Sequence, residues 1–390
     1  MKNLLTGILK YHLIPIVAAT AFTLLVYYLF LWLKPEIENH IVRGQHTAFS
    51  GAFGNCAENE QAELELAGAL DDPRVITMFG SSELGSMAYS SYFFLPDSLN
   101  MPLVAFGHAH HQHFSIFCEL LAMQKYLKKS KICIVISPGW FETEGTNIEA
   151  FLEFVRPNFL KSIIHNKEIP LQYKIEIGRF VSEHFSDIDH PAEYLYYFRD
   201  LYEDRKKPVA NEVLQQTTKV NKVQYEIKKG SFEKREVANV DWQQTAARLQ
   251  KKFLDSNQNN AIYVSNAYYS EYLLKNGVFI KSKPVKIAKP SANREYQDFL
   301  LMIEILKQNG CEASFIIQPL NPYYYEGLEN YSEVIAGMKK VMEQNNFPYL
   351  DMFVTGKKAY QPATLNDIMH LGDYGWNRIN RFLYENYAKQ

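Results

Sequence analysis

Two serines follow a short apolar run in the first half of the chain, within the sequence GSSEL at residues 80–84. The run Val75–Phe79 has the composition of a buried parallel strand, so we expect the serines where this strand turns into a helix. A serine there would project at the carboxyl edge of a sheet, near helix amides that can stabilise an oxyanion. Alternatively, Ser81 or Ser82 simply caps the helix. The nucleophile pattern GxSxG is not matched, because Leu84 occupies its fifth position.

Asp367 and His370 stand three residues apart near the end of the chain. Residues with this spacing can meet on one side of a helical turn. A carboxylate so placed can accept a hydrogen bond from imidazole Nδ1–H and leave Nε2 ready to take a proton from a serine hydroxyl. A DxxH pair alone also fits an ordinary surface turn. Combined with a serine that follows a strand, it predicts a Ser–His–Asp arrangement.

Apolar runs and helical periodicities alternate around these residues. The further strands that we expect are Leu103–Phe106, Ile132–Ile136, Ser314–Ile317 and Tyr349–Met352. Apolar residues recur at helical spacing in the segments 114–123, 296–306 and 376–383. Strands that alternate with helices predict an α/β domain with a doubly wound parallel sheet, here over residues 74–390, with ligands at the carboxyl ends of the strands. We interpret residues 143–290 as a helical insertion in this domain.

On these residues the chain resembles the SGNH (GDSL-like) hydrolase superfamily, and within it the DltD family of D-alanyl transfer proteins. The resemblance rests on FGSSEL at residues 79–84, SPGWF at residues 137–141, and the Asp367/His370 pair before Gly375 and Trp376. It implies a three-layer α/β/α fold behind a single N-terminal transmembrane helix.

The same resemblance implies roles for single residues. It matches Ser82 to a nucleophile, His370 to the general base and Asp367 to the residue that orients the base. Gly107 matches a glycine whose N–H, together with that of Ser82, binds the oxyanion. The implied activity is transfer of D-alanine to lipoteichoic acid through an ester on Ser82, with DltB and DltX as partners and no cofactor.

Two other functions remain open at this point. An esterase or thioesterase would use the same acyl-enzyme with water as the acceptor. A non-catalytic subunit would bind teichoic acid or its carrier without any acyl-enzyme.

One residue departs from the family pattern. The third block of the superfamily supplies an Asn side chain, and the DltD family has Gln in SPQWF, whereas Gly139 stands at this position here. Loss of one oxyanion donor typically costs about 2.7–4 kcal/mol in the transition state. Either Gln112 or a backbone amide near Trp140 substitutes for the missing donor, or the oxyanion hole is weak until a partner docks.

Further polar residues follow the second and fourth strands. The second strand is followed by His108, His110, His111 and His113. We expect no metal site there, since no acidic residue lies among them and adjacent histidines seldom converge on one ion. Instead, we expect His108, and at most one other, to line the cleft beside Ser82, with the rest solvated. After the fourth strand, Asn321 and Tyr323 are candidates for substrate contact.

A basic stretch lies in the middle of the chain. From Arg205 to Arg235, nine basic residues face three acidic ones. They form either a solvated helical face or a patch that attracts the phosphates of an anionic polymer. Under the second hypothesis, the patch includes Lys206, Lys207, Lys228 and Lys229.

The N-terminal run Leu13–Leu33 contains no charged residue and is long enough to cross the ~30 Å hydrocarbon core of a bilayer. Lys2 and Lys10 precede it, which predicts a cytoplasmic N-terminus at residues 1–12 and a domain outside the membrane. A cleaved signal peptide is the alternative, although the run exceeds a typical apolar region of about 7–15 residues. The mixed, polar residues 34–73 are expected to form a stalk.

Composition excludes several classes of protein. The chain has 390 residues, with 41 Lys and Arg against 43 Asp and Glu, which is unlike the basic balance of a nucleic-acid binder. A mean hydropathy of −0.25 excludes a polytopic membrane protein. A hydrophobic content of 47% excludes a disordered chain. The cysteines show neither CxxC nor zinc-site spacing; they are Cys56, Cys118, Cys133 and Cys311.

Overall fold

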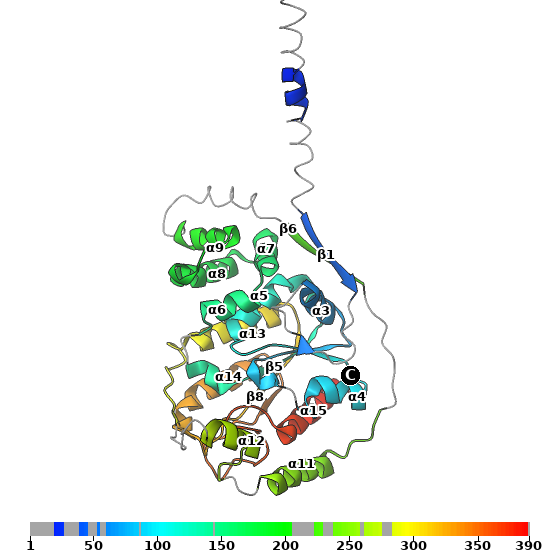
Figure 1. Cartoon of the computed structure of the whole chain (residues 1–390), viewed down its shortest axis with the longest axis vertical. Coiled ribbons are helices and arrows are strands. Elements are labelled where there is room, and N and C mark those ends of the chain that lie inside the picture. Colours follow the sequence, from blue (N-terminus) through cyan, green and yellow to red (C-terminus); the bar gives the residue numbers. More distant parts are fainter. Residues whose placement is uncertain are drawn as a thin grey trace, which may run out of the picture.

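The computed structural model describes residues 19–26, 39–45, 53–54, 60–85, 87–142, 145–204, 222–228, 237–257, 261–274 and 283–388 (Figure 1). Most of the predicted basic patch lies outside the described residues, including Lys206, Lys207 and Lys229; Lys228 is described for its backbone alone.

Parallel strands form the central sheet, in the order β10-β8-β5-β3-β4-β2. Their bounds are β2 Phe53–Gly54, β3 Ile76–Phe79, β4 Leu103–Phe106, β5 Lys131–Ile136, β8 Glu312–Ile317 and β10 Tyr349–Asp351. From β3 the chain adds β4 on one side and then β5, β8 and β10 on the other, which is the doubly wound arrangement that the sequence predicts. Each predicted strand is present within a residue or two, and the short edge strand β2 is an addition.

Helices cover both faces of the sheet (Figure 1). On one face lie α3 Glu60–Asp71, α5 His113–Ala122, α13 Arg294–Gln308 and α14 Ser332–Gln344. On the other lie α4 Ser91–Leu99 and α15 Asp373–Tyr387. Strand β3 contributes Phe79 to the first core, and Ile76 and Met78 to the second. Because both faces are buried, the central strands are mostly apolar along their length rather than alternating, which confirms the predicted α/β fold.

The described part of residues 143–290 is mainly helical, as expected. Its helices are α6 Ile148–Phe154, α7 Pro157–His165, α8 Leu171–Glu183, α9 Glu193–Asp204, α11 Trp242–Ser256 and α12 Asn266–Tyr268. Helices α8 and α9 pack closely, since a Cβ on Gly178 would lie 2.3 Å from the Phe198 carbonyl oxygen. Short strands β7 Lys283–Pro284 and β9 Tyr325–Glu326 pair beside the domain.

The prediction that residues 34–73 form a stalk is wrong for the part of this range that forms helix α3. Its residues Leu66, Ala67 and Leu70 are buried in the core, so this helix belongs to the domain. In the sequence, acidic residues interrupt the apolar face of this helix, so its burial is not evident. One of them, Glu63, is itself buried and pairs with Arg156. Upstream, β1 Asn39–Gln45 pairs in parallel with β6 Lys222–Lys228 of the insertion.

Residues 19–26 of the predicted membrane span are helical, and their apolar side chains are exposed, from 48% for Val26 to 67% for Phe22. The rest of Leu13–Leu33 lies outside the described residues. Within the described ranges, no helix combines the length and apolarity needed to cross a membrane.

Candidate active site

Strand β3 ends at Phe79, and the chain then turns into a short 3-10 helix, Ser82–Leu84. We call residues 80–85 the serine turn. Two backbone hydrogen bonds close it, from the Leu84 N–H to the Ser81 carbonyl and from the Gly85 N–H to the Ser82 carbonyl, both at 3.1 Å. Ser81 is buried and makes no capping hydrogen bond with its side chain. Ser82 is only half-buried, so its hydroxyl is the more accessible of the two.

The loop after β4 touches the serine turn at Gly107. This residue has φ +156°, and an added Cβ would lie 2.0 Å from the Gly80 carbonyl oxygen. No other residue type fits so close an approach. The backbone of Gly107 therefore lies directly beside the turn that holds Ser82, where the sequence expects an oxyanion donor.

The Asp367/His370 pair lies in a loop before α15, not in the helical turn that its spacing suggests. A bridge between Leu365 and Leu371 closes this loop. Asp367 Oδ1 accepts from the N–H groups of Met369, at 2.8 Å, and His370, at 2.7 Å. The second oxygen, Oδ2, lies 2.7 Å from His370 Nδ1. The carboxylate thus fixes both the backbone and the ring of the histidine.

The contact with Asp367 assigns the proton of neutral His370 to Nδ1 and leaves the lone pair on Nε2. The hydrogen bond with Asp367 raises the pKa of His370, against the opposing effect of burial, and the charges of Asp367 and Glu83 add to the rise. The His370 side chain is 36% exposed, whereas that of Asp367 is 10% exposed. A base with these properties can exchange a proton with a bound molecule.

Two observations bring the serine turn and the Asp367/His370 loop together. Leu84 of the turn shares one buried cluster with Leu365 and Leu371 of the loop. The charge of Glu83, next to Ser82 in the chain, acts on His370. No hydrogen bond joins Ser82 to His370 in the described part of the chain. The two groups therefore lie in one region without a hydrogen bond between them.

Glu83 is a site residue that sequence reasoning missed. Its side chain is buried, and its Oε1 accepts from the Ser81 N–H at 2.6 Å. Burial raises its pKa to about 7, although two backbone amides and the charges of His370 and His111 favour the carboxylate. The available signal was an acidic residue in a turn that is otherwise built of small and apolar residues.

The four histidines after β4 divide into two exposed and two buried side chains. His108, expected beside Ser82, is exposed, as is His110. The histidine that contacts the serine turn is His111, whose Nδ1 lies 3.1 Å from the Gly80 carbonyl oxygen. The expectation that the other histidines are solvated is wrong for His111 and His113, because each has a buried carboxylate partner, Glu119 and Glu295 respectively. The described ranges contain no metal-binding group of three or more His, Cys, Asp or Glu residues.

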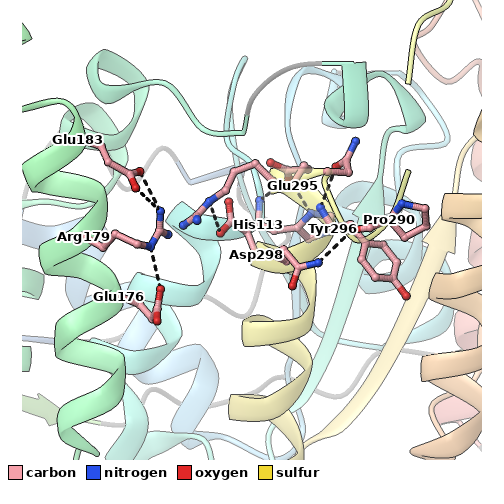
Figure 2. A network of polar contacts seen from close by, with 11 residues as sticks. His113, Glu176, Arg179, Glu183, Pro290, Glu295, Tyr296 and Asp298 are labelled. Carbon is pink, nitrogen blue, oxygen red and sulfur yellow. Dashed lines mark hydrogen bonds and ion pairs between the residues drawn. The ribbon is translucent and has the colours of Figure 1, made fainter. Parts of the chain in front are cut away.

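A network of polar contacts links His113 with residues of α13, and near it lies a second set of ion pairs on α8 (Figure 2). His113 Nδ1 lies 2.6 Å from Glu295 Oε1, and neither side chain is exposed. One turn along α13, burial raises the pKa of Asp298 well above its ordinary value, and Arg294 lies 3.2 Å from this carboxylate. On α8, Arg179 pairs with Glu176 and Glu183, and its charge acts on Asp298.

A model of the family described as DltD protein matches residues 58–388. The chain belongs to the DltD family. Protein DltD of Bacillus subtilis (strain 168) is 23% identical over 345 residues, and the alignment covers 82% of this chain and 83% of that protein. The family takes part in the D-alanylation of teichoic acid. The match begins just before α3, in agreement with the place of this helix in the domain.

The position where the DltD pattern has Gln lies in a short 3-10 helix, Pro138–Glu142. A Cβ on Gly139 would have Ser137 Oγ as its nearest neighbour, at 3.6 Å, so there is room for a side chain. Gln112, a candidate replacement donor, is buried and donates from Nε2 to the Trp140 carbonyl at 3.4 Å. Gln112 and Trp140 thus lie together, with the Gln112 amide directed at the backbone of this segment.

The loop after β8 has a structural residue and a surface residue. Asn321 is fully buried, and its Nδ2 donates to the Ile262 carbonyl at 2.9 Å. Its backbone N–H donates to the Ile368 carbonyl within the Asp367/His370 loop. Substrate contact by Asn321 is therefore contradicted by its burial. Tyr323 remains a candidate, since it is half-buried with its ring packed against Tyr263.

Proposed function

We propose that this DltD-family protein is a serine acyltransferase that accepts D-alanine on Ser82 and passes it to lipoteichoic acid. The observation that supports this most is the pair of Asp367 and His370, 2.7 Å apart, with a half-exposed base beside the serine turn. A bound and oriented imidazole is what a serine hydroxyl requires to act as a nucleophile near neutral pH.

In the first half of the proposed reaction, Ser82 Oγ attacks the carbonyl carbon of an activated D-alanyl donor while His370 Nε2 takes the hydroxyl proton. The amides of Ser82 and Gly107 stabilise the oxyanion. The donor's leaving group then departs with the proton from His370, and a D-alanyl ester on Ser82 remains.

In the second half, a hydroxyl of the acceptor polymer gives its proton to His370 and attacks the ester carbonyl. Ser82 leaves and recovers the proton from His370, so the enzyme returns to its first state. Asp367 keeps Nε2 directed at the reacting oxygens and stabilises the imidazolium that forms in each half. This mechanism, with its SGNH-type order of residues, needs no cofactor.

The proposal includes a membrane anchor at Leu13–Leu33, with the domain outside the membrane. It is supported by the uncharged sequence of this run and by the exposed apolar side chains of the helix at residues 19–26. An anchored domain would meet its polymer acceptor at the membrane surface. By family resemblance, DltB and DltX are its partners there.

The experiment is labelling of the full-length protein with a fluorophosphonate probe, followed by peptide mass spectrometry. We expect a label on Ser82 that is lost in Ser82→Ala and reduced at least ~10³-fold in rate in His370→Ala. Ser81→Ala is the matched control and should keep the label. A label on Ser81, or one independent of His370, would contradict the assignment.

The labelled protein can then be tested with D-alanyl donor and polyglycerolphosphate. Ester-linked D-alanine on the polymer supports transfer, whereas free D-alanine alone indicates an esterase. A wild-type protein that is never labelled would favour the alternative hypothesis of a non-catalytic binding subunit.

A further inference from the structure

Glu83 takes no part in the reaction described above, yet it follows the nucleophile directly and its side chain is buried. We propose that Glu83 is a positioning residue that couples the serine turn to the general base: its carboxylate holds the turn, and its charge acts on His370. This inference rests on the proposed roles of Ser82 and His370.

The holding role follows from the contacts of the turn. Glu83 Oε1 accepts from the Ser81 N–H at 2.6 Å, while the Ser81 carbonyl accepts from the Leu84 N–H. On the opposite side, His111 Nδ1 lies 3.1 Å from the Gly80 carbonyl oxygen. Because this oxygen only accepts hydrogen bonds, His111 Nδ1 must carry a proton, while Nε2 lies 3.1 Å from Glu119 Oε2. The peptide group between Gly80 and Ser81 is thus held at both its N–H and its carbonyl by buried side chains. The next peptide group, which carries the Ser82 N–H, is held by the backbone bond from the Leu84 N–H to the Ser81 carbonyl.

The electrostatic role follows from what surrounds the carboxylate. Two titratable groups act on Glu83: His370 from the loop before α15, and His111 from the loop before α5. Each of these histidines is itself paired with a carboxylate, His370 with Asp367 and His111 with Glu119. Neither imidazole is a permanent charge, and the carboxylate has little contact with water. The positive charge of either histidine favours the ionised form of Glu83, and the charge of Glu83 in turn raises the pKa of His370.

This mutual dependence has a consequence for the reaction. When Glu83 is ionised, its charge stabilises the His370 imidazolium that forms as Ser82 is deprotonated. The pKa of Glu83 is about 7, so this support is lost as the pH falls through the neutral range. Protonation of Glu83 removes the charge that raises the pKa of His370, so the acid limb of the Ser82 labelling rate should be broader than the titration of a single histidine.

The test compares full-length wild type with Glu83→Gln and Glu83→Ala across the acid and neutral pH range. Gln keeps an oxygen acceptor for the Ser81 N–H but has no charge, whereas Ala loses both. The readouts are the rate of fluorophosphonate labelling at Ser82 and the titration of the His370 imidazole by NMR. Asp351→Asn is the control, since this carboxylate pairs with Lys339 away from the turn.

For Glu83→Gln we expect the acid limb to narrow to that of a single group and its midpoint to fall by about half a pH unit, with the His370 titration falling in parallel. For Glu83→Ala we expect the same shift and, in addition, a plateau rate about tenfold below that of Glu83→Gln, because the turn is no longer held. Asp351→Asn should follow the wild type.

An unchanged midpoint, slope and His370 titration in Glu83→Gln would overturn the electrostatic coupling. Equal plateau rates for Gln and Ala would overturn the holding role. A wild type that is never labelled would end the proposed function, while the His370 titration, which needs no activity, would still decide the coupling.

Discussion

Two histidine–carboxylate pairs of nearly equal length serve different purposes in this molecule. His370 lies 2.7 Å from Asp367, and His113 lies 2.6 Å from Glu295. The His370 side chain is 36% exposed, whereas that of His113 is fully buried among Trp140, Phe141 and Phe299. In the described part of the chain, His113 Nε2 has no hydrogen-bond partner.

The comparison teaches that the pair itself does not mark a catalytic site. In both cases the carboxylate holds Nδ1, and the difference lies in what Nε2 can reach. The Nε2 of His370 can meet a bound molecule, but the surrounding rings enclose that of His113. His113 and Glu295 therefore join α5 to α13, whereas of these two pairs it is Asp367/His370 that suits the proposed proton transfer.

The first prediction tests the difference between the two pairs by replacing each carboxylate in turn with an amide. Asp367→Asn should lower the rate of Ser82 labelling by about 10²- to 10⁴-fold, because an amide no longer selects the tautomer with Nε2 free. The melting temperature should change little. The comparable change Glu295→Gln should leave the rate per folded molecule unaltered. Similar losses of rate in both variants would refute the distinction.

The second prediction concerns stability. Glu295→Ala leaves the Nδ1–H and the backbone N–H of His113 without their shared acceptor in a fully buried site. We expect the free energy of unfolding to fall by about 3 kcal/mol. Urea denaturation measures this loss, and Asp367→Ala in the half-exposed pair should cost clearly less. A larger loss for Asp367→Ala would reverse the assignment of structural and functional pairs.

The smallest predicted effect sharpens the catalytic side. Gly139→Gln restores the side chain of the DltD pattern at a position with room for a Cβ, and should raise the rate of labelling about tenfold by adding an oxyanion donor. Gly139→Ala adds a Cβ without a donor and is the control. Equal rates for the two variants would mean that another group already fills this role.

The contrast between the two pairs also explains what the sequence could predict. Asp367 and His370 are close in the chain, so their spacing indicated the contact, and the apolar runs indicated the strands between which the serine turn lies. Glu295 is 182 residues away from His113, and no local pattern reveals such a partner. For the same reason, the burial of His111 and Asn321 could not be predicted.

Glu83 and helix α3 were missed for a different reason. In both, acidic residues stand where burial depends on the surrounding fold, and acidic residues are rarely fully buried unless they are paired. The partner of Glu63, for example, is Arg156 in the insertion. Local composition therefore predicted solvent exposure for residues that the tertiary structure encloses.

The pairing of β1 with β6 limits how far the domain can move from its proposed anchor. Between Leu33 and Asn39 there are only six peptide steps, which span at most about 20 Å when fully extended. After them the chain is paired, residue by residue, with Lys222–Lys228 of the insertion. The tether is thus short, and its far end is fastened to the insertion rather than to the central sheet. If the proposed anchor is present, a domain held by so short a segment would work close to the bilayer surface and would meet the proposed acceptor polymer near its lipid end.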